Sequence, residues 1–194
     1  MLRKLLGPLV LLAVIGGAAG VAYASHDHTD NLQSVRQATM QFRSLSVANR
    51  AEYGLLLDAQ NIACIDMPGM GAMGVHYVNG DLVGDGEIDA LTPEAVVYES
   101  DSNGRQHLVA LEYVVFKDAW DGHHDSVPTL FGQKFATTPA GNRFGLPAYY
   151  SLHVWLYKHN PAGMFAMWNP KVTCTPDDHH DGQHGEAQMG QMDG

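Results

Sequence analysis

Hydrophobic and polar positions in the first part of the chain follow a helical period. No glycine or proline interrupts residues 30–53. Apolar side chains recur there at steps of three and seven, at Leu32, Val35, Phe42 and Leu45. This spacing places them on one face of a helix. The pattern therefore predicts one long N-terminal helix over residues 30–53.

The pattern changes after Cys64. Short apolar runs now alternate with clusters of Gly, Asn, Asp and Pro, which is typical of strands joined by turns. Strands are predicted at 74–78, 95–99, 107–116 and 149–157, and loops at 117–127 and 133–146. We expect an α+β fold in which the long helix packs on an antiparallel β-sheet.

The first 24 residues have the layout of a secretory signal. Arg3 and Lys4 precede an apolar run at 5–15, and Ala22-Tyr23-Ala24 supplies small residues for cleavage. We expect a mature chain from residue 25, in the periplasm or otherwise outside the cytoplasm. The alternative is a retained membrane anchor, since about 20 apolar residues cross a bilayer. No second apolar segment of that length follows, so the mature chain is predicted to have no membrane span.

Residues 25–174 are expected to form a single globular domain, because 194 residues supply one ordinary core. The last segment, 175–194, contains five acidic residues, three histidines, two methionines and no aromatic residue. Such a segment buries too little apolar surface to fold, so it is predicted to be disordered. Its histidines, His179, His180 and His184, are expected to bind transition metals only weakly.

The chain has two cysteines, Cys64 and Cys174. In an exported protein they are expected to form one structural disulfide. The alternative is a pair of thiolate metal ligands.

The charge balance argues against a nucleic-acid partner. Eleven basic residues stand against 21 acidic ones, and no basic stripe is interleaved with aromatic residues. The common motifs of nucleophilic catalysis and phosphate binding are also missing from the sequence. Whether the protein is an enzyme therefore stays open.

Glu112 is the first candidate for chemistry. In the strand predicted at 107–116, alternation gives it the same face as Leu108, Ala110, Val114 and Phe116. A carboxylate among core residues must be paired, hydrogen-bonded or bound to a metal, because burial of an unpaired charge is costly.

Two histidines lie on other predicted strands. His153 shares a face with Trp155, whereas Leu152 and Val154 take the opposite face, and His76 lies on the strand at 74–78. If these faces meet that of Glu112, two imidazoles and one carboxylate converge into a ligand set used for iron, zinc and copper. The alternative is a buried hydrogen-bond network that holds the core together.

Methionines provide a second set of candidate ligands. Met67, Met70 and Met73 recur every third residue through a glycine-rich segment, and His76 follows at the same step. Thioether sulfur is a soft ligand suited to Cu(I). The alternative is that these methionines fill irregular gaps in the core.

Several segments together resemble a family of small exported bacterial proteins of unknown function. They are Pro68-Gly-Met-Gly, Val75-His-Tyr-Val-Asn, Pro93-Glu-Ala-Val-Val-Tyr-Glu, Leu111-Glu-Tyr, Leu130-Phe-Gly, Leu152-His-Val-Trp-Leu, His159-Asn-Pro-Ala-Gly-Met-Phe, Trp168-Asn-Pro and Cys174. The resemblance implies that these segments form one module, with the tail outside it. It implies no activity, cofactor or substrate.

The leading hypothesis is an exported protein that binds a transition metal, copper or zinc, through His76, Glu112 and His153, in metal handling at the cell envelope. One alternative is a small metal-dependent enzyme, with Tyr77, Tyr113 or Trp155 lining a pocket. Another is a non-catalytic structural or interaction module, in which the same residues only stabilise the core.

Overall fold

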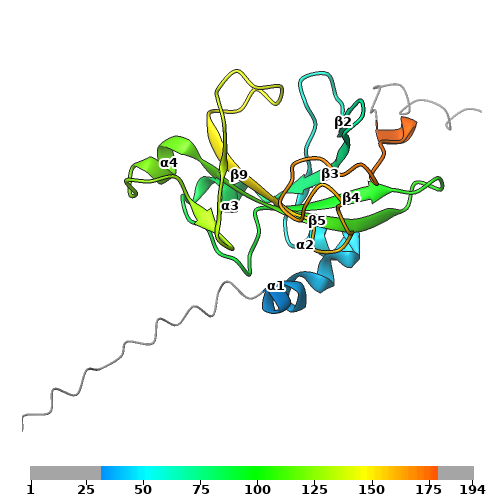
Figure 1. The fold of residues 1–194 in the computed structure, drawn as a ribbon, viewed down its shortest axis with the longest axis horizontal. Coiled ribbons are helices and arrows are strands. Elements are labelled where there is room, and N and C mark those ends of the chain that lie inside the picture. Colours follow the sequence, from blue (N-terminus) through cyan, green and yellow to red (C-terminus); the bar gives the residue numbers. More distant parts are fainter. Residues whose placement is uncertain (1–31, 179–194) are drawn as a thin grey trace, which may run out of the picture.

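The structure is a computed structural model, and it describes residues 32–178 (Figure 1). The signal segment expected at 1–24 lies outside the described residues. So do the three tail histidines, His179, His180 and His184.

An antiparallel sheet of seven strands forms the centre of the described chain, in the order β1-β3-β4-β5-β9-β8, with β2 also paired to β3. The strands are β1 (Gly54–Leu55), β2 (Cys64–Met67), β3 (Gly71–Val78), β4 (Ala95–Ser100), β5 (Gln106–Phe116), β8 (Ala136–Thr138) and β9 (Tyr149–Val154). A separate hairpin consists of β6 (Thr129–Leu130) and β7 (Gln133–Lys134). All four predicted strands are present, as β3, β4, β5 and β9.

The prediction of one long N-terminal helix is wrong. Residues 32–50 instead contain three short helical pieces, α1 (Leu32–Thr39), the 3₁₀ turn η1 (Met40–Arg43) and α2 (Leu45–Arg50). The Thr39 hydroxyl donates to the carbonyl of Val35 at 2.7 Å, a contact that bends helices, and Ser44 is extended, with φ −96° and ψ 109°. The fold is therefore mostly antiparallel sheet with short helices.

The remaining helices are also short: α3 (Gly80–Gly84), α4 (Lys117–Asp121) and the 3₁₀ turn η2 (Pro176–Asp178). The segment 117–127, predicted as a loop, thus begins with a helix. The segment 133–146 was also predicted as a loop, but it contains β7 and β8. No helix within residues 32–178 has the length and apolar character needed to cross a membrane.

The helical pieces α1, η1 and α2 cover one face of the sheet (Figure 1). Their side chains Val35, Phe42 and Ala48 belong to the same buried cluster as Leu111 and Val154 of the sheet. This cluster is the larger hydrophobic core. The helical pieces leave the opposite face of the sheet uncovered, so side chains on that face pack against other parts of the chain.

A smaller core on the opposite face lies around the disulfide. Cys64 and Cys174 are bonded, as predicted, with Cα atoms 5.5 Å apart and a separation of 110 residues in the sequence. Cys64 packs in this core with Val75, Trp155 and Val172. The bond therefore fixes the C-terminal segment against β2 and β3.

The folded body continues past Cys174. Asp178 is buried, and its carboxylate accepts hydrogen bonds from the Ser100 hydroxyl at 2.5 Å and the Thr175 backbone N–H at 2.6 Å. Residues 175–178 are thus part of the packed structure, although the domain was predicted to end at 174.

Two bulges interrupt the alternation of the strands. In β5 the pairing with β4 shifts by one residue between Leu108 and Ala110, and in β3 the pairing with β2 skips Met73. Because a bulge reverses the alternation of faces, Leu108 joins the core beside the helices. The predicted common face of Leu108 and Glu112 is therefore wrong.

Candidate metal centre

Three buried residues from three strands converge on the face opposite the helices. Glu112 of β5 lies directly opposite His153 of β9 in the ladder, and His76 extends from β3 across β4. Their exposed fractions are 4 % for each histidine and 8 % for the glutamate. The predicted convergence of these residues is therefore confirmed, and among residues 32–178 they form a group able to hold a metal ion.

The separations within this His–Glu–His cluster are short and nearly equal. His76 Nε2 lies 3.1 Å from His153 Nε2 and 3.2 Å from Glu112 Oε2. His153 Nδ1 lies 3.2 Å from Glu112 Oε1. One candidate ligand atom can be chosen from each residue so that all lie within 4.8 Å of one another.

Glu112 is the charged member of the cluster. Its burial raises the pKa of the carboxyl, but the charge of His153 and hydrogen bonding by both histidines outweigh burial and hold the pKa well below its usual range. A metal ion would find this residue as a carboxylate, which is the form that coordinates metals.

Neighbouring groups fix the histidine rings. The two imidazoles meet edge to face, with centroids 5.1 Å apart, and His153 stacks on Trp155 at 5.8 Å. Trp155 is itself held by a 2.6 Å hydrogen bond from its indole N–H to the carbonyl of Ala166. Preorganised rings lose little freedom when they bind a ligand.

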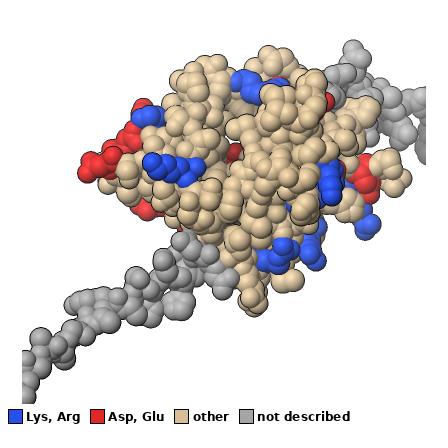
Figure 2. Space-filling view, viewed as in Figure 1, with Lys and Arg blue, Asp and Glu red and all other residues tan. Residues whose placement is uncertain are grey.

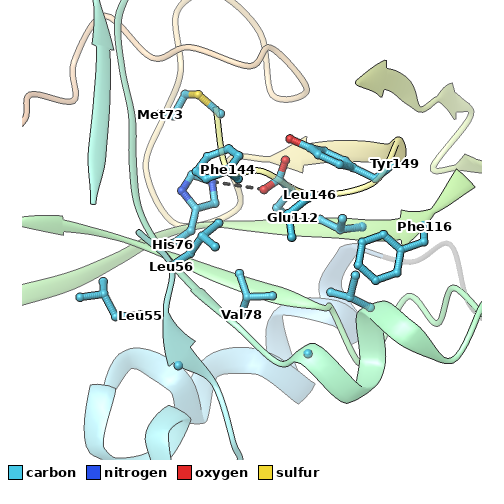
Figure 3. A pocket seen from close by; sticks show the side chains of 14 residues that line it. Leu55, Leu56, Met73, His76, Val78, Glu112, Phe116, Phe144, Leu146 and Tyr149 are labelled. Atoms are coloured by element: carbon cyan, nitrogen blue, oxygen red, sulfur yellow. Dashed lines mark ion pairs between the residues drawn. The ribbon is translucent and has the colours of Figure 1, made fainter. Parts of the chain in front are cut away.

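A cavity of about 330 Å³ adjoins the cluster (Figure 3). It is lined by Gly54, Leu55, Leu56, Met73, His76, Val78, Gly80, Val83, Glu112, Val114, Phe116, Phe144, Leu146 and Tyr149. The walls are predominantly apolar, as is usual for sites that take small molecules. His76 and Glu112 therefore present their polar atoms to a mostly apolar space.

The loop 139–147 contributes Phe144 and Leu146 to this cavity. The Asn142 amide oxygen organises the loop by accepting from the backbone N–H groups of both residues at 3.2 Å. Arg143 anchors the loop, since its Nε donates to the buried Asp58 carboxylate at 3.0 Å. These lining residues were not predicted from the sequence, because an irregular loop has no periodicity.

Tyr149 is a further lining residue that was not predicted from the sequence. Figure 3 shows its hydroxyl end directed toward the Glu112 carboxylate. Burial raises the pKa of this hydroxyl; a hydrogen bond with the Thr138 side chain opposes the shift, and the charge of Glu112 adds to it. Tyr149 therefore stays neutral at ordinary pH. Strand alternation could have indicated this position, because Tyr149 begins β9 and shares a face with Ser151 and His153.

The aromatic residues suggested as pocket walls do not line this cavity. Tyr113 lies on the opposite face, where its hydroxyl donates to the carbonyl of Ala90 at 2.6 Å. Tyr77 packs edge to face on Tyr98, at 5.4 Å between centroids. Trp155 contacts His153 instead of the cavity. Strand alternation explains the position of Tyr113, because the residue after Glu112 points to the other face of the sheet.

The three methionines of the glycine-rich segment take different positions. Met67 ends β2 and Met70 lies on the turn that follows it, and they are 42 % and 48 % exposed. Met73 lines the cavity together with His76. The structure thus brings one of the three predicted sulfur ligands to the site and leaves two at the surface.

The position of Met73 follows from the bulge in β3. Gly74, the next residue, has φ +93°, and a Cβ there would lie 2.8 Å from the carbonyl oxygen of Tyr98. Only glycine fits such a close approach with this backbone conformation. The bulge leaves Met73 without a partner in β2 and allows it to share the cavity with His76.

Charged residues are dispersed over the face shown in Figure 2. Lysine and arginine side chains form small separate groups there instead of a continuous stripe. That the protein has no nucleic-acid partner stays a prediction from composition.

Comparisons with protein-family models, with curated proteins and with solved structures gave no match. The resemblance to a family of small exported bacterial proteins accordingly stays a prediction.

Proposed function

We propose that this protein binds one divalent transition-metal ion, zinc or copper, through His76, Glu112 and His153. The observation that carries the proposal is that one ligand atom can be chosen from each of these three buried side chains so that all three atoms lie within 4.8 Å of one another. Two imidazoles and one carboxylate form a ligand set that zinc and copper use.

The proposed centre is open on one side. Three protein ligands leave at least one coordination position for another molecule, which distinguishes catalytic and ligand-binding centres from closed structural ones. The adjoining cavity provides space for such a molecule beside His76 and Glu112. We therefore place the function in metal-dependent binding or conversion of a small molecule.

Metal content tests this proposal directly. The full chain would be purified without an affinity tag and analysed for metals, beside a His76→Ala, His153→Ala double variant. A matched control, His107→Ala with His159→Ala, removes two exposed histidines instead. We expect close to one metal ion per chain in the parent and control and none in the site variant.

Two results would contradict the proposal. One is protein without metal that also takes up neither zinc nor copper on titration. The other is a site variant that keeps its metal at the level of the control. Either result would favour the structural module, in which the cluster is a hydrogen-bond network of the core.

Copper handling is a second candidate, favoured by the place of Met73 in the cavity with His76. A thioether at the site would add a soft ligand for Cu(I). If copper is the ion, Met73→Leu should weaken Cu(I) binding more than Met67→Leu with Met70→Leu, because those two lie at the surface. Equal Cu(I) affinity in the parent, in Met73→Leu and in the Met67→Leu, Met70→Leu double variant would contradict copper handling.

We also propose that the protein works outside the cytoplasm. The disulfide supports this location, since such bonds persist in oxidising compartments. N-terminal sequencing of the protein from a cell-envelope or secreted fraction should give a chain that begins at residue 25. Recovery of the reduced, uncleaved chain from the cytoplasm would contradict this proposal.

A further inference from the structure

The cavity beside the proposed metal centre is apolar along most of its surface. Leucine, valine and phenylalanine side chains from five segments enclose it, and Figure 3 shows them around the space next to His76 and Glu112. They are Leu55, Leu56, Val78, Val83, Val114, Phe116, Phe144 and Leu146. An occupant therefore needs an apolar body, because a polar one would lose its hydrogen bonds to water.

The polar groups of the cavity are few and lie together. Apart from the Met73 thioether, its polar side chains are His76, Glu112 and Tyr149. In Figure 3 the Tyr149 hydroxyl is on the side of the Glu112 carboxylate, away from Phe116. An occupant would thus meet hydrogen-bonding groups and the metal at one end only.

Charge defines the group expected at that end. A divalent ion bound by one carboxylate and two neutral imidazoles keeps one net positive charge. In apolar surroundings an uncompensated charge is costly, and a monoanion bound to the ion would neutralise it. The Tyr149 hydroxyl, which also has a side-chain hydrogen bond with Thr138, lies at this end of the cavity.

From these features we infer that the cavity takes a small apolar monocarboxylate, whose carboxylate completes the coordination of the metal ion. The volume of about 330 Å³ is at the lower end of the range of about 300–1,000 Å³ for ligand pockets, which limits the molecule to a single ring or a short chain. This inference rests on the proposed function, because the metal supplies the charge that selects the anion.

Calorimetric titration of the full chain loaded with zinc tests the inference. Benzoate and hexanoate are the probes, benzamide is the neutral control of equal shape, and acetate is the anionic control without an apolar body. We expect both probes to bind at least about tenfold more tightly than either control. Removal of zinc with a chelator should abolish this preference.

A cavity variant provides a second measurement. Leu146→Trp would fill space in the cavity from the loop 139–147 and would leave the metal ligands unchanged. Leu91→Trp is its control, since Leu91 is 39 % exposed and does not line the cavity. We expect the first variant to keep zinc and to lose benzoate binding, and the second to keep both.

The outcomes separate the two proposals. Failure to bind either zinc or copper would remove the proposed function and this inference together. Zinc-loaded protein that binds neither probe at millimolar concentration, or binds benzamide as tightly as benzoate, would overturn the inference and leave the metal site in place. Benzoate binding that Leu146→Trp does not weaken would place the carboxylate elsewhere and would also overturn it.

Discussion

Glu112 and His153 face each other across the β5–β9 ladder, and Glu112 Oε1 lies 3.2 Å from His153 Nδ1. This pair is built by the strands themselves, because residues directly opposite in an antiparallel ladder have neighbouring side chains. His76 joins it from two strands away. The rigid sheet therefore sets the geometry of the cluster, and loops contribute only its cover.

Replacement of Glu112 by Gln should affect both stability and metal binding. The variant keeps the shape of the side chain but loses the charge that the two histidines contact. In metal-free protein we expect the free energy of unfolding to fall by about 1–3 kcal/mol. Metal affinity should fall at least about 100-fold, since even groups that only orient ligands are worth about 10- to 100-fold. Urea unfolding with a chelator and metal titration measure the two effects.

Glu99→Gln is the control for this substitution. Glu99 pairs with Lys158 closer to the surface, so its loss should change stability by less than about 1 kcal/mol. Unchanged metal affinity in Glu112→Gln would show that the carboxylate is no ligand.

Gly74→Ala should disrupt the bulge in β3. The added Cβ would meet the carbonyl oxygen of Tyr98 and Cγ1 of Val97, each at 2.8 Å, and φ is +93°. We expect a loss of about 1–3 kcal/mol in urea unfolding. The control is Gly84→Ala, where nothing lies within 4 Å of the new atom. Equal stability of the two variants would contradict the structural role assigned to the bulge.

Arg143→Gln should release the loop 139–147 from Asp58. The side chain of Arg143 donates to a buried carboxylate, and a hydrogen bond to a charged group contributes about 1.5–3 kcal/mol. The amides of Phe144 and Leu146 should then exchange hydrogen faster, as Asn142 no longer holds them in place. Hydrogen exchange measures this, with Arg105→Gln at an exposed turn as control. Exchange at the parent rate would show that Arg143 does not anchor the loop.

Glu94 should make the protein less stable as the pH rises. Burial raises the pKa of this carboxyl to about 8, although its Oε2 accepts the backbone N–H of Val114 at 2.9 Å. The unfolded chain releases the proton near pH 4.5, so between pH 4.5 and 8 the folded state binds more protons. Over that range Glu94 should lower the free energy of unfolding by up to about 1.4 kcal/mol per pH unit.

Glu94→Gln isolates this contribution from the titration of other groups. Gln keeps an oxygen for the Val114 N–H but does not titrate. The difference in unfolding free energy between variant and parent should grow from pH 5 to pH 8. Glu87→Gln, at an exposed position, should show no such trend. A parallel pH dependence of parent and Glu94→Gln would contradict the buried neutral carboxyl.

The sequence was informative wherever strand alternation alone decides the outcome. Glu112, Val114 and Phe116 do share a face, and His76 and His153 meet it, because period-two alternation survives in the uninterrupted parts of β3, β5 and β9. The disulfide followed from the compartment expected for the chain. The first inference needed only the alternation of residues within each strand, and the second needed only the pairing of the two cysteines.

Other features depend on contacts that no local pattern records. The helical period at 30–53 continues through Thr39 and Ser44, yet the Thr39 hydroxyl also contacts that of Tyr157, 118 positions away, at 2.8 Å. The bulge that moves Leu108 to the other face arises from pairing between strands. Phe144 and Leu146 reach the cavity from an irregular loop. Tertiary structure decides all of these.

The disulfide closes a covalent ring that contains His76, Glu112 and His153, since all three lie between Cys64 and Cys174. Unfolding of the oxidised chain cannot open this ring, so the unfolded state has lower conformational entropy than that of the reduced chain. The entropy lost when the three side chains come together on folding is therefore smaller. If the cluster binds a metal ion as proposed, metal affinity and the redox state of the cysteines are linked through folding. The reduced chain would then assemble the three ligands less readily than the oxidised protein.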